Sequence, residues 1–373
     1  MERPPHGDAS APASAGQLTH ADELAAIVEA FQPGVSHAVG YGSGVFGQRP
    51  AAGKEGEDRE EESPMIDLLL AVPDPVVFHR QNLDRRPGHY SALCRLMGAG
   101  PVSALQRKAA AVHFHPLVDS PAAAHAAAAG GRRRRRIKYG VIHEADLLAD
   151  LTEWRWLYAA GRMQKPTVAV PVGAEGAAAA ALAEAQGRNL DMALAAALLL
   201  LPPPNPGGEG RGTWGLGTLH ETIAGLSYGG DPRMALGGED PDKVSKLARS
   251  EGQGGRFAAL YGGALRRWEG EGMLSVDRTG GCGDVGGTVR LDLDHAPTRR
   301  RLWGTLPPGV RRGACSGFAT AGESAAHLAS VLAGIVGPAA RAQSAKGLLT
   351  AGVARSARYA AAKFAKGALR GVA

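Results

Sequence analysis

The stretch Val39-Gly40-Tyr41-Gly42-Ser43-Gly44-Val45-Phe46-Gly47-Gln48 decides the fold of this 373-residue chain, together with the later run Met65-Ile66-Asp67-Leu68-Leu69-Leu70-Ala71-Val72. The first is an apolar approach to a Gly-Ser turn, and the second is an apolar strand with one acid near its start. Backbone N–H groups of such a turn can hold phosphate oxygens, and a facing carboxylate can hold a metal ion. The pair predicts nucleotide-transfer chemistry, with phosphates at Tyr41, Gly42, Ser43 and Gly44 and with Asp67 opposite them.

The two segments resemble the signature of the nucleotidyltransferase superfamily typified by DNA polymerase beta, in which a Gly-Ser turn precedes a strand with two alternating carboxylates. Gly42, Ser43 and Asp67 match this signature. Leu69 stands where the second carboxylate would be, so the metal site departs from the superfamily pattern. We expect Asp67 and Asp74 to be the metal ligands. Asp146 and Asp150 remain open as alternatives to Asp74, because the sequence does not choose among the three.

Further blocks extend the match along most of the chain, from about residue 25 to about residue 355. They include Asn82, His89-Tyr90-Ser91, residues 137–142, residues 157–166, residues 223–231, Arg233-Met234 and residues 344–352. In this order, the blocks resemble the mitochondrial phosphatidate cytidylyltransferase family, first named for translocator assembly and maintenance.

The resemblance implies an activity: CTP and phosphatidic acid would give CDP-diacylglycerol and pyrophosphate, feeding cardiolipin synthesis. It also implies Mg²⁺ as cofactor and a peripheral location on the matrix side of the mitochondrial inner membrane. Loop cations beside a sheet edge can neutralise phosphate charge. The residues expected to act in catalysis are Asp67, Lys138, Arg162 and Lys165, and those expected to bind the nucleotide are Tyr41, Gly42, Ser43, Gly44, Asp231 and Arg233.

Two other functions compete with this one. A non-catalytic membrane-surface adaptor on a degenerate nucleotidyltransferase scaffold, supporting protein import, would account for Leu69 in place of an acid. A nucleic-acid nucleotidyltransferase would need basic and aromatic residues alternating along a groove, which the sequence does not contain. We therefore expect no nucleic-acid partner.

The predicted fold class is α/β (α+β), with a polymerase-beta-like nucleotidyltransferase sheet, then a winged-helix-like helical domain and a C-terminal amphipathic helix. Residues 1–20 are expected to be disordered, and residues 21–173 to form the nucleotidyltransferase domain with insertions at 49–63 and 120–136. The helical domain is predicted at 174–268, and a glycine-rich region with helices at 269–340. The basic tail is predicted at 341–373.

Cysteine and histidine spacing gives little sign of a structural metal site. The three cysteines Cys94, Cys282 and Cys315 are an odd number without metal-ligand spacing, which indicates free thiols in a reducing compartment. His113 and His115 share one strand face, but no third ligand type lies near them in the sequence. The arginine run 132–136 is expected to lie in a surface loop.

The membrane predictions concern both ends of the chain. By inspection, no apolar window is expected to reach the length of a membrane-spanning helix, since the best candidate, 190–201, contains Asp191 and runs into three prolines. Residues 1–16 are a poor mitochondrial presequence because they include acids and few basic residues. Residues 341–373 have no acid and combine apolar side chains with seven basic ones, namely Arg341, Lys346, Arg355, Arg358, Lys363, Lys366 and Arg370. This composition predicts a helix that lies on an anionic membrane.

Overall fold

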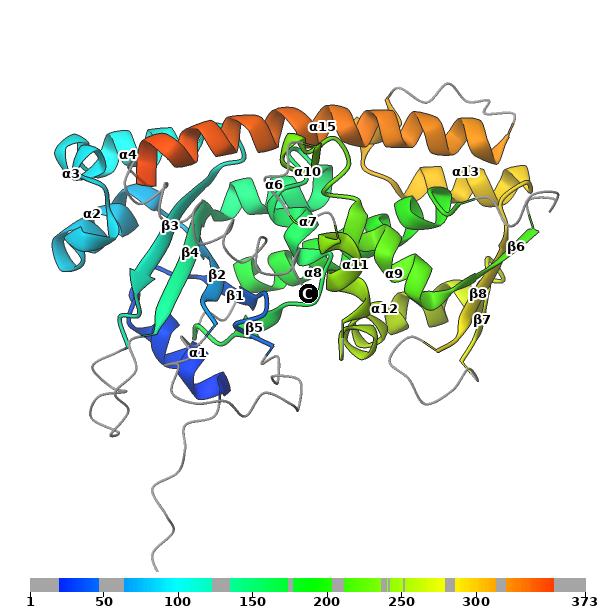
Figure 1. Ribbon diagram of the computed structural model, residues 1–373, viewed down its shortest axis with the longest axis horizontal. Coiled ribbons are helices and arrows are strands. Elements are labelled where there is room, and N and C mark those ends of the chain that lie inside the picture. Colours follow the sequence, from blue (N-terminus) through cyan, green and yellow to red (C-terminus); the bar gives the residue numbers. More distant parts are fainter. Residues whose placement is uncertain are drawn as a thin grey trace, which may run out of the picture.

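The computed structural model describes residues 20–46, 64–122, 135–173, 177–202, 211–235, 240, 242–250, 252–278, 286–312 and 320–351. A mixed sheet with helices forms one half of the molecule, and a group of helices with a small sheet forms the other (Figure 1). One long helix runs along both halves. The predictions for residues 1–19, for the insertion at 49–63, for most of the insertion at 120–136, for Cys282 and Cys315, and for residues 352–373 lie outside the described residues.

The larger sheet has five strands in the order β3-β4-β2-β1-β5. Their bounds are His37–Tyr41 (β1), Ile66–Val72 (β2), Val112–Asp119 (β3), Arg136–His143 (β4) and Val168–Val170 (β5). β2 runs parallel to β4, whereas the pairs β1 with β2, β1 with β5 and β3 with β4 are antiparallel. β2 is buried on both faces, as its continuous apolar sequence predicts. This mixed sheet with its helices confirms the α+β class.

Seven helical segments surround this sheet, and we call the whole of residues 20–173 the sheet unit. They are α1 (His20–Glu29), α2 (Pro75–Arg85), the short 3-10 helix η1 (Pro87–His89), α3 (Ala92–Met97), α4 (Ala99–Gln106), α6 (Glu144–Glu153) and α7 (Ala159–Met163). Asp74 starts α2, because its carboxylate accepts the backbone N–H groups of Val76 and Val77 and Pro75 fits the first turn.

The second half, residues 177–312, is called the helical unit, and it differs from the prediction in one respect. Its elements are α8 (Ala177–Leu199), β6 (Arg211–Gly215), α9 (Leu216–Gly225), α10 (Pro232–Ala235), α11 (Lys243–Arg249), α12 (Gln253–Gly270), β7 (Ser275–Asp277), β8 (Thr288–Asp292), α13 (Ala296–Thr305) and α14 (Pro308–Arg311). Residues 213–215, predicted to be helical, instead pair in β6 with β8. The sheet β6-β8-β7 therefore joins the helical residues to the glycine-rich region across the boundary predicted at 268.

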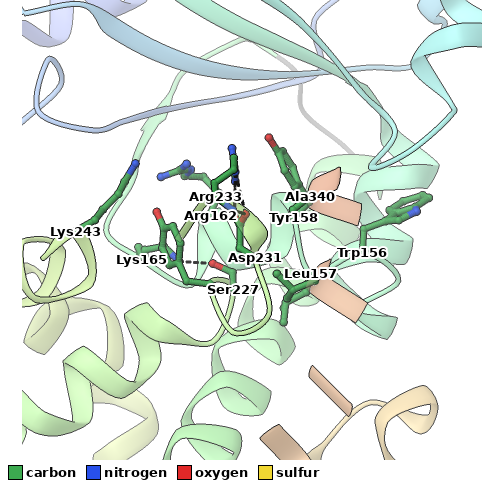
Figure 2. Close-up of a pocket in the computed structure, with 12 residues that line it drawn as sticks. Trp156, Leu157, Tyr158, Arg162, Lys165, Ser227, Asp231, Arg233, Lys243 and Ala340 are labelled. Carbon is green, nitrogen blue, oxygen red and sulfur yellow. Dashed lines mark hydrogen bonds and ion pairs between the residues drawn. The ribbon is translucent and has the colours of Figure 1, made fainter. Parts of the chain in front are cut away.

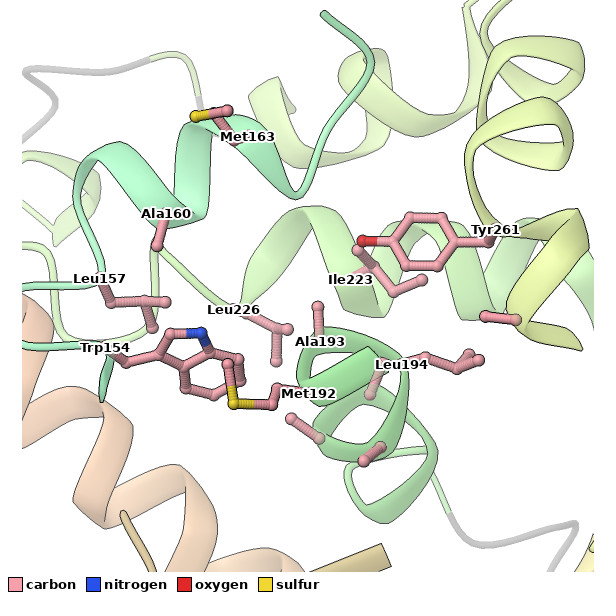
Figure 3. Packing of buried hydrophobic residues seen from close by; sticks show 14 of the residues in the cluster. Trp154, Leu157, Ala160, Met163, Met192, Ala193, Leu194, Ile223, Leu226 and Tyr261 are labelled. Atoms are coloured by element: carbon pink, nitrogen blue, oxygen red, sulfur yellow. The ribbon is translucent and has the colours of Figure 1, made fainter. Parts of the chain in front are cut away.

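The two units share one hydrophobic core around the buried half of α8. Figure 3 shows α8 residues Met192, Ala193 and Leu194 packed between Trp154 of the sheet unit and Ile223 of α9. The indole of Trp154 donates to Asn189 Oδ1 at 2.9 Å, so this buried polar pair is satisfied within the core. Alanines on α8 allow the neighbouring helices to approach closely, which explains why this Ala/Leu-rich segment is buried in the core.

The long helix α15 (Ala321–Ala351) corrects the predicted C-terminal boundary. It packs against α14, α10, α8 and β3 in turn, so residues 341–351 belong to the fold and are not a separate tail. Its inward face places Gln343 on the carbonyl of Val112 at 2.9 Å. Lys346 is also buried and donates to the carbonyls of Gln106 and Lys108, so it is not one of the exposed membrane cations that we predicted.

The helix also corrects the prediction that no segment is long enough to cross a bilayer. Among the described residues, Ala321–Thr350 is long and apolar enough to do so by length and composition, and about a third of its most apolar window is buried inside the protein. Core helices meet the same criterion, and α15 has buried residues along its length, including Leu328, Leu332 and Gln343. Packing accounts for the apolar residues on the inward face of α15, whereas Leu348 and Leu349 remain exposed.

A buried group of histidines lies where α2, α4 and β3 meet α15. His79, His113 and His115 are at most 1% exposed. His79 is bonded to Tyr90 at 2.8 Å and to Gln106 at 2.7 Å, and His115 stacks on Tyr139 with ring centroids 4.4 Å apart. Within the described ranges, no group of three His, Cys, Asp or Glu side chains could hold a metal ion. The group is a polar packing layer.

We expect acid to destabilise the protein through this group. Burial lowers the pKa of His79 to about 4 and holds the pKa values of His113 and His115 well below normal. The unfolded chain takes up protons near pH 6.5 and the folded chain does not, so this stability is complete above about pH 6.5 and is lost as pH falls toward 4. The Tm should therefore fall steeply between pH 7 and pH 5.

A variant and a control make this prediction specific. His113→Phe removes one buried titrating ring whose Nδ1 has no hydrogen-bond partner, so the Tm of the variant should fall less between pH 7 and pH 5. His295→Gln changes an exposed histidine and should keep the parental slope. If His113→Phe showed the same slope as the parent, another group would be responsible for the acid sensitivity.

Candidate functional site

The three central strands bring Tyr41, Asp67 and Lys138 side by side. In the register of the sheet, Tyr41 pairs with Asp67 and Asp67 pairs with Lys138. Lys138 Nζ lies 3.3 Å from Asp67 Oδ1, and each side chain is about one-fifth exposed. The sheet thus holds a carboxylate and an ammonium next to each other at the edge where the Gly-Ser turn begins.

The turn after β1 closes over this carboxylate. Gly42 has a φ of 82°, and a Cβ added there would lie 3.2 Å from Asp67 Oδ2. A Cβ at Gly44 would lie 2.0 Å from the carbonyl oxygen of Met65, so only glycine fits. Ser43 is exposed between them, and the N–H of Val45 closes the turn on the carbonyl of Gly42 at 3.1 Å. The predicted cradle therefore lies directly beside Asp67.

Arg162 reaches the same place from α7. Its guanidinium lies over the ring of Tyr41, 4.4 Å from the centroid. Burial lowers the pKa of Arg162, but Tyr228, Tyr41 and Asp67 act in the opposite direction and leave the pKa above its usual value. Arg162 is therefore a permanent cation close to the Asp67 carboxylate.

Lys165 has a different role from the one predicted for it. Its buried ammonium donates to the carbonyls of Gly161 and Ala224 and to Ser227 Oγ, the last at 2.8 Å. These bonds use all three donors, so the side chain has none left for a phosphate. Burial, with Arg162 and Lys243 nearby, holds the pKa of Lys165 well below normal. Lys165 therefore links α7 to the end of α9 through hydrogen bonds, and it is not positioned to bind a phosphate.

Asp150 holds the loop that leads into α7. Its buried carboxylate accepts backbone N–H groups from Trp156, Leu157, Tyr158 and Ala160 at 2.8 to 3.0 Å. Burial raises the pKa of Asp150, and the four hydrogen bonds oppose the rise. Because its oxygens are fully used, Asp150 is not available as a metal ligand. Its role is to position the helix that carries Arg162.

Asp74 and Asp146 lie at the wrong end of the sheet for the predicted metal role. Asp67 is near the start of β2, whereas Asp74 follows its end and caps α2. The strand rises about 3.3 Å per residue, so the five steps from Asp67 to Val72 already separate their Cα atoms by about 16 Å. α6, which carries Asp146, begins after the end of the parallel strand β4. Neither acid can share an ion with Asp67, so the prediction of Asp74 as a metal ligand is wrong.

A pocket opens where α7, the turn after α9, α11 and α15 meet. Its volume is about 530 Å³ including the open mouth, and it is lined by Trp156, Leu157, Tyr158, Arg162, Lys165, Ser227, Tyr228, Asp231, Arg233, Lys243, Val336 and Ala340. Figure 2 shows the side chains of Arg162, Arg233 and Tyr158 close together above Asp231. The pocket is thus rich in cations and tyrosines, as a site for an anion with an apolar portion requires.

Asp231 and Arg233 form one structural element in this pocket. The Asp231 carboxylate is bound by Arg233 in bidentate fashion, with Nε at 3.1 Å from both oxygens and Nη2 at 2.6 Å from Oδ2. The Asp231 side chain is 1% exposed and that of Arg233 is 35% exposed. Asp231 therefore holds the guanidinium of Arg233 in place, and only the arginine is open to a ligand.

The structure adds residues that the sequence patterns did not identify. Tyr158, Ser227, Tyr228 and Lys243 line the pocket, although no motif marked them individually. Tyr158 and the pair Ser227-Tyr228 fall inside blocks used for the resemblance, so a block match was their only signal. Lys243 starts α11 and faces the Tyr228 ring at 5.9 Å. Nothing in its local sequence distinguishes it from a surface lysine.

Comparison with known proteins identifies the family of this chain. The family model described as "Phosphatidate cytidylyltransferase, mitochondrial" matches residues 24–366. Relatives with the same name are 31% identical in Mus musculus, over 92% of this chain and 94% of the relative, and 32% identical in Xenopus laevis, over 91% and 93%. A relative of that name in Caenorhabditis elegans is 30% identical, over 89% and 94%. The match spans both units and nearly the whole of these relatives.

Proposed function

Because the chain belongs to the mitochondrial phosphatidate cytidylyltransferase family, we propose that it converts CTP and phosphatidic acid to CDP-diacylglycerol and pyrophosphate. A phosphate oxygen of the lipid attacks the α-phosphorus of CTP, and the bond from that phosphorus to the pyrophosphate oxygen breaks. The lipid phosphate is already ionised at neutral pH, so the protein needs no strong base. Its task is to align the reactants and to balance their negative charge.

One observation carries this proposal, namely the position of the glycine turn directly above Asp67. The turn offers backbone N–H groups to the triphosphate, and Lys138 and Arg162 place positive charge on either side of the carboxylate. Arg233 and Lys243 supply further cations at the pocket, which suits a substrate with several phosphates. These groups also keep the two anionic substrates from repelling one another.

The residues beside the glycine turn can hold Mg²⁺ only if CTP supplies most of the ligands of the ion. Among the described residues, Asp67 is the carboxylate that lies beside the turn, and Leu69 is buried in the core. Mg²⁺ is commonly held by one or two carboxylates together with phosphate oxygens, so Asp67 would hold an ion that arrives with CTP. Such an ion would neutralise charge on the triphosphate. Leu69 in place of the second carboxylate of the signature predicts weak metal binding without nucleotide.

A turnover assay tests the activity. Labelled CTP and liposomes with phosphatidic acid should give labelled CDP-diacylglycerol with Mg²⁺ and little without it. The rival function, a non-catalytic adaptor, predicts no product under either condition. The adaptor is not favoured, because the curated relatives are named as enzymes and the site combines a carboxylate with a glycine turn and pocket cations.

We also propose a peripheral location on the matrix side of the mitochondrial inner membrane. The names of the relatives support the organelle, and the lipid substrate requires contact with a bilayer surface. Residues 352–373 contribute five basic residues and no acid, namely Arg355, Arg358, Lys363, Lys366 and Arg370. Each basic residue near an anionic surface adds roughly 1 kcal/mol of attraction before screening.

Deletion of residues 352–373 should therefore weaken binding to anionic liposomes. The cut must follow Ala351, because an earlier one would remove the packed residues Gln343 and Lys346. Sedimentation with vesicles should show less bound protein, and binding of the full chain should weaken with salt as screening shortens the attraction. CTP binding should persist. Unchanged sedimentation of the shortened chain would contradict a membrane role for these residues.

A further inference from the structure

Most of the large exposed hydrophobic side chains gather at one place. Among the described residues, five large hydrophobics are strongly exposed, and four of them lie on α3 and the end of α15. They are Leu93 at 48%, Leu96 at 86%, Leu348 at 62% and Leu349 at 60% exposed. Single exposed leucines are ordinary, whereas a group of them marks an interaction surface.

The two leucine pairs flank one contact between α3 and α15. Cys94 Sγ lies 3.6 Å from the carbonyl oxygen of Thr350, and both of these residues are buried. Leu93 and Leu96 are three residues apart, so they share one side of α3. In Figure 1 the end of α15 lies beside α3 and α4, at one extremity of the molecule. We call these four leucines the leucine patch.

The segments that carry the leucine patch, α3 and the end of α15, contain basic residues and no acid. No Asp or Glu occurs from Arg85 to Val118, which covers α3 and α4, and none follows Glu323. Arg95, Arg107, Lys108 and Arg341 are exposed on these segments. Exposed Asp84 on the neighbouring helix α2 is the nearest acid in the sequence. Apolar side chains beside several exposed cations complement an anionic lipid surface.

The leucine patch is also connected to the pocket through α15. Val336 and Ala340 line the pocket, and Leu348 lies eight residues beyond Ala340 on the same helix. Eight residues of helix rise about 12 Å. The leucine patch and the pocket are therefore separated by only about two turns of one helix.

We propose that the leucine patch inserts into an anionic bilayer and docks the sheet unit, through α3, directly on the membrane that carries the lipid substrate. The membrane contact is then shared by two elements far apart in sequence, and it does not depend on residues 352–373 alone. This proposal rests on the proposed function for the choice of a lipid surface. It adds α3 as a membrane-binding element.

Vesicle sedimentation tests the proposal. The variants are Leu93→Ser with Leu96→Ser, Leu348→Ser with Leu349→Ser, and Leu96→Glu, with Ala258→Glu on the exposed face of α12 as the matched charge control. Burying a leucine side chain changes a partition coefficient by roughly tenfold or more, so each patch variant should bind phosphatidic acid vesicles at least about tenfold more weakly. The control should bind as the parent does. A Tm within a few degrees of the parent establishes that each variant is folded.

Three outcomes would overturn the proposal. Patch variants that sediment like the parent would show that the leucines do not enter the bilayer. A parent that is dimeric by sedimentation velocity, with monomeric patch variants, would assign the leucine patch to a second copy of the chain. Loss of vesicle binding on deletion of 352–373, with no effect of the leucine variants, would assign the contact wholly to the C-terminal residues.

A soluble substrate separates this proposal from the proposed function. With short-chain phosphatidic acid that does not form bilayers, the patch variants should turn over CTP like the parent, because their pocket residues are unchanged. Loss of turnover only on vesicles supports the leucine patch. Absence of turnover by the parent on both substrates would refute the enzymatic function, and vesicle binding would still report on the leucine patch.

Discussion

Asp67→Asn is expected to abolish turnover while leaving the fold nearly intact. The amide keeps the shape of the side chain on β2 but removes the charge of the carboxylate that lies beside the glycine turn. Lys138 then loses its ion pair with Asp67. Without that negative charge, a divalent ion on the triphosphate loses its anchor on the protein.

The measurement is the rate of CDP-diacylglycerol formation at saturating CTP and Mg²⁺, with the Tm as a control for folding. Asp74→Asn is the matched control, because it makes the same change at the far end of β2, where the side chain only caps α2. It should cost some stability and leave the chemistry in place. Activity of Asp67→Asn within about threefold of the parent would refute the metal role.

Gly42→Val is expected to have the second-largest effect, through loss of nucleotide binding. The backbone at Gly42 has a φ of 82°, which a β-branched residue adopts only with strain, and its Cβ would press on Asp67 Oδ2 at 3.2 Å. A side chain there also blocks the approach of phosphate to the backbone N–H groups. Affinity for CTP should fall at least about tenfold, corresponding to 1.4 kcal/mol.

Ser43→Ala at the next position is the control, because Ser43 is exposed and its backbone N–H remains. It should cost less affinity than Gly42→Val. Calorimetric titration with CTP in the absence of lipid measures both variants without any contribution from membrane binding. Unchanged affinity in Gly42→Val would mean that the triphosphate does not bind at the glycine turn.

The sequence predicted the parts of the fold that depend on local patterns. The apolar run of β2 predicted a central strand, and the Gly-Ser turn predicted a close backbone approach, because both follow from steric rules that act within a few residues. The strand β6 was missed, since its five residues include two glycines and its partner β8 lies more than 70 residues later. Pairing over that distance leaves no local signature.

The sequence predicted which segments meet at the candidate site, but it did not predict the contacts of every charged side chain. Asp67, Lys138 and Arg162 meet as expected, because strand register and a loop beside the sheet edge bring them together. Lys165 and Lys346 look like surface cations in the sequence, yet both ammonium groups are buried on backbone carbonyls supplied by other elements. Charge patterns cannot identify such lysines, because their partners lie about 60 and 240 residues away.

The position of α15 has a consequence for the order in which the protein is made. Cys94, Gln106 and Val112 are covered by residues of α15 that are synthesised 231 to 256 positions later. At about 5 to 20 residues per second, the sheet unit waits roughly ten seconds to a minute for that cover. During this time its outer layer beside β3 is open, so chaperones or import factors can act on it. A chain truncated before α15 would therefore lack its C-terminal residues, and the surface of the sheet unit at Cys94, Gln106 and Val112 would also stay uncovered.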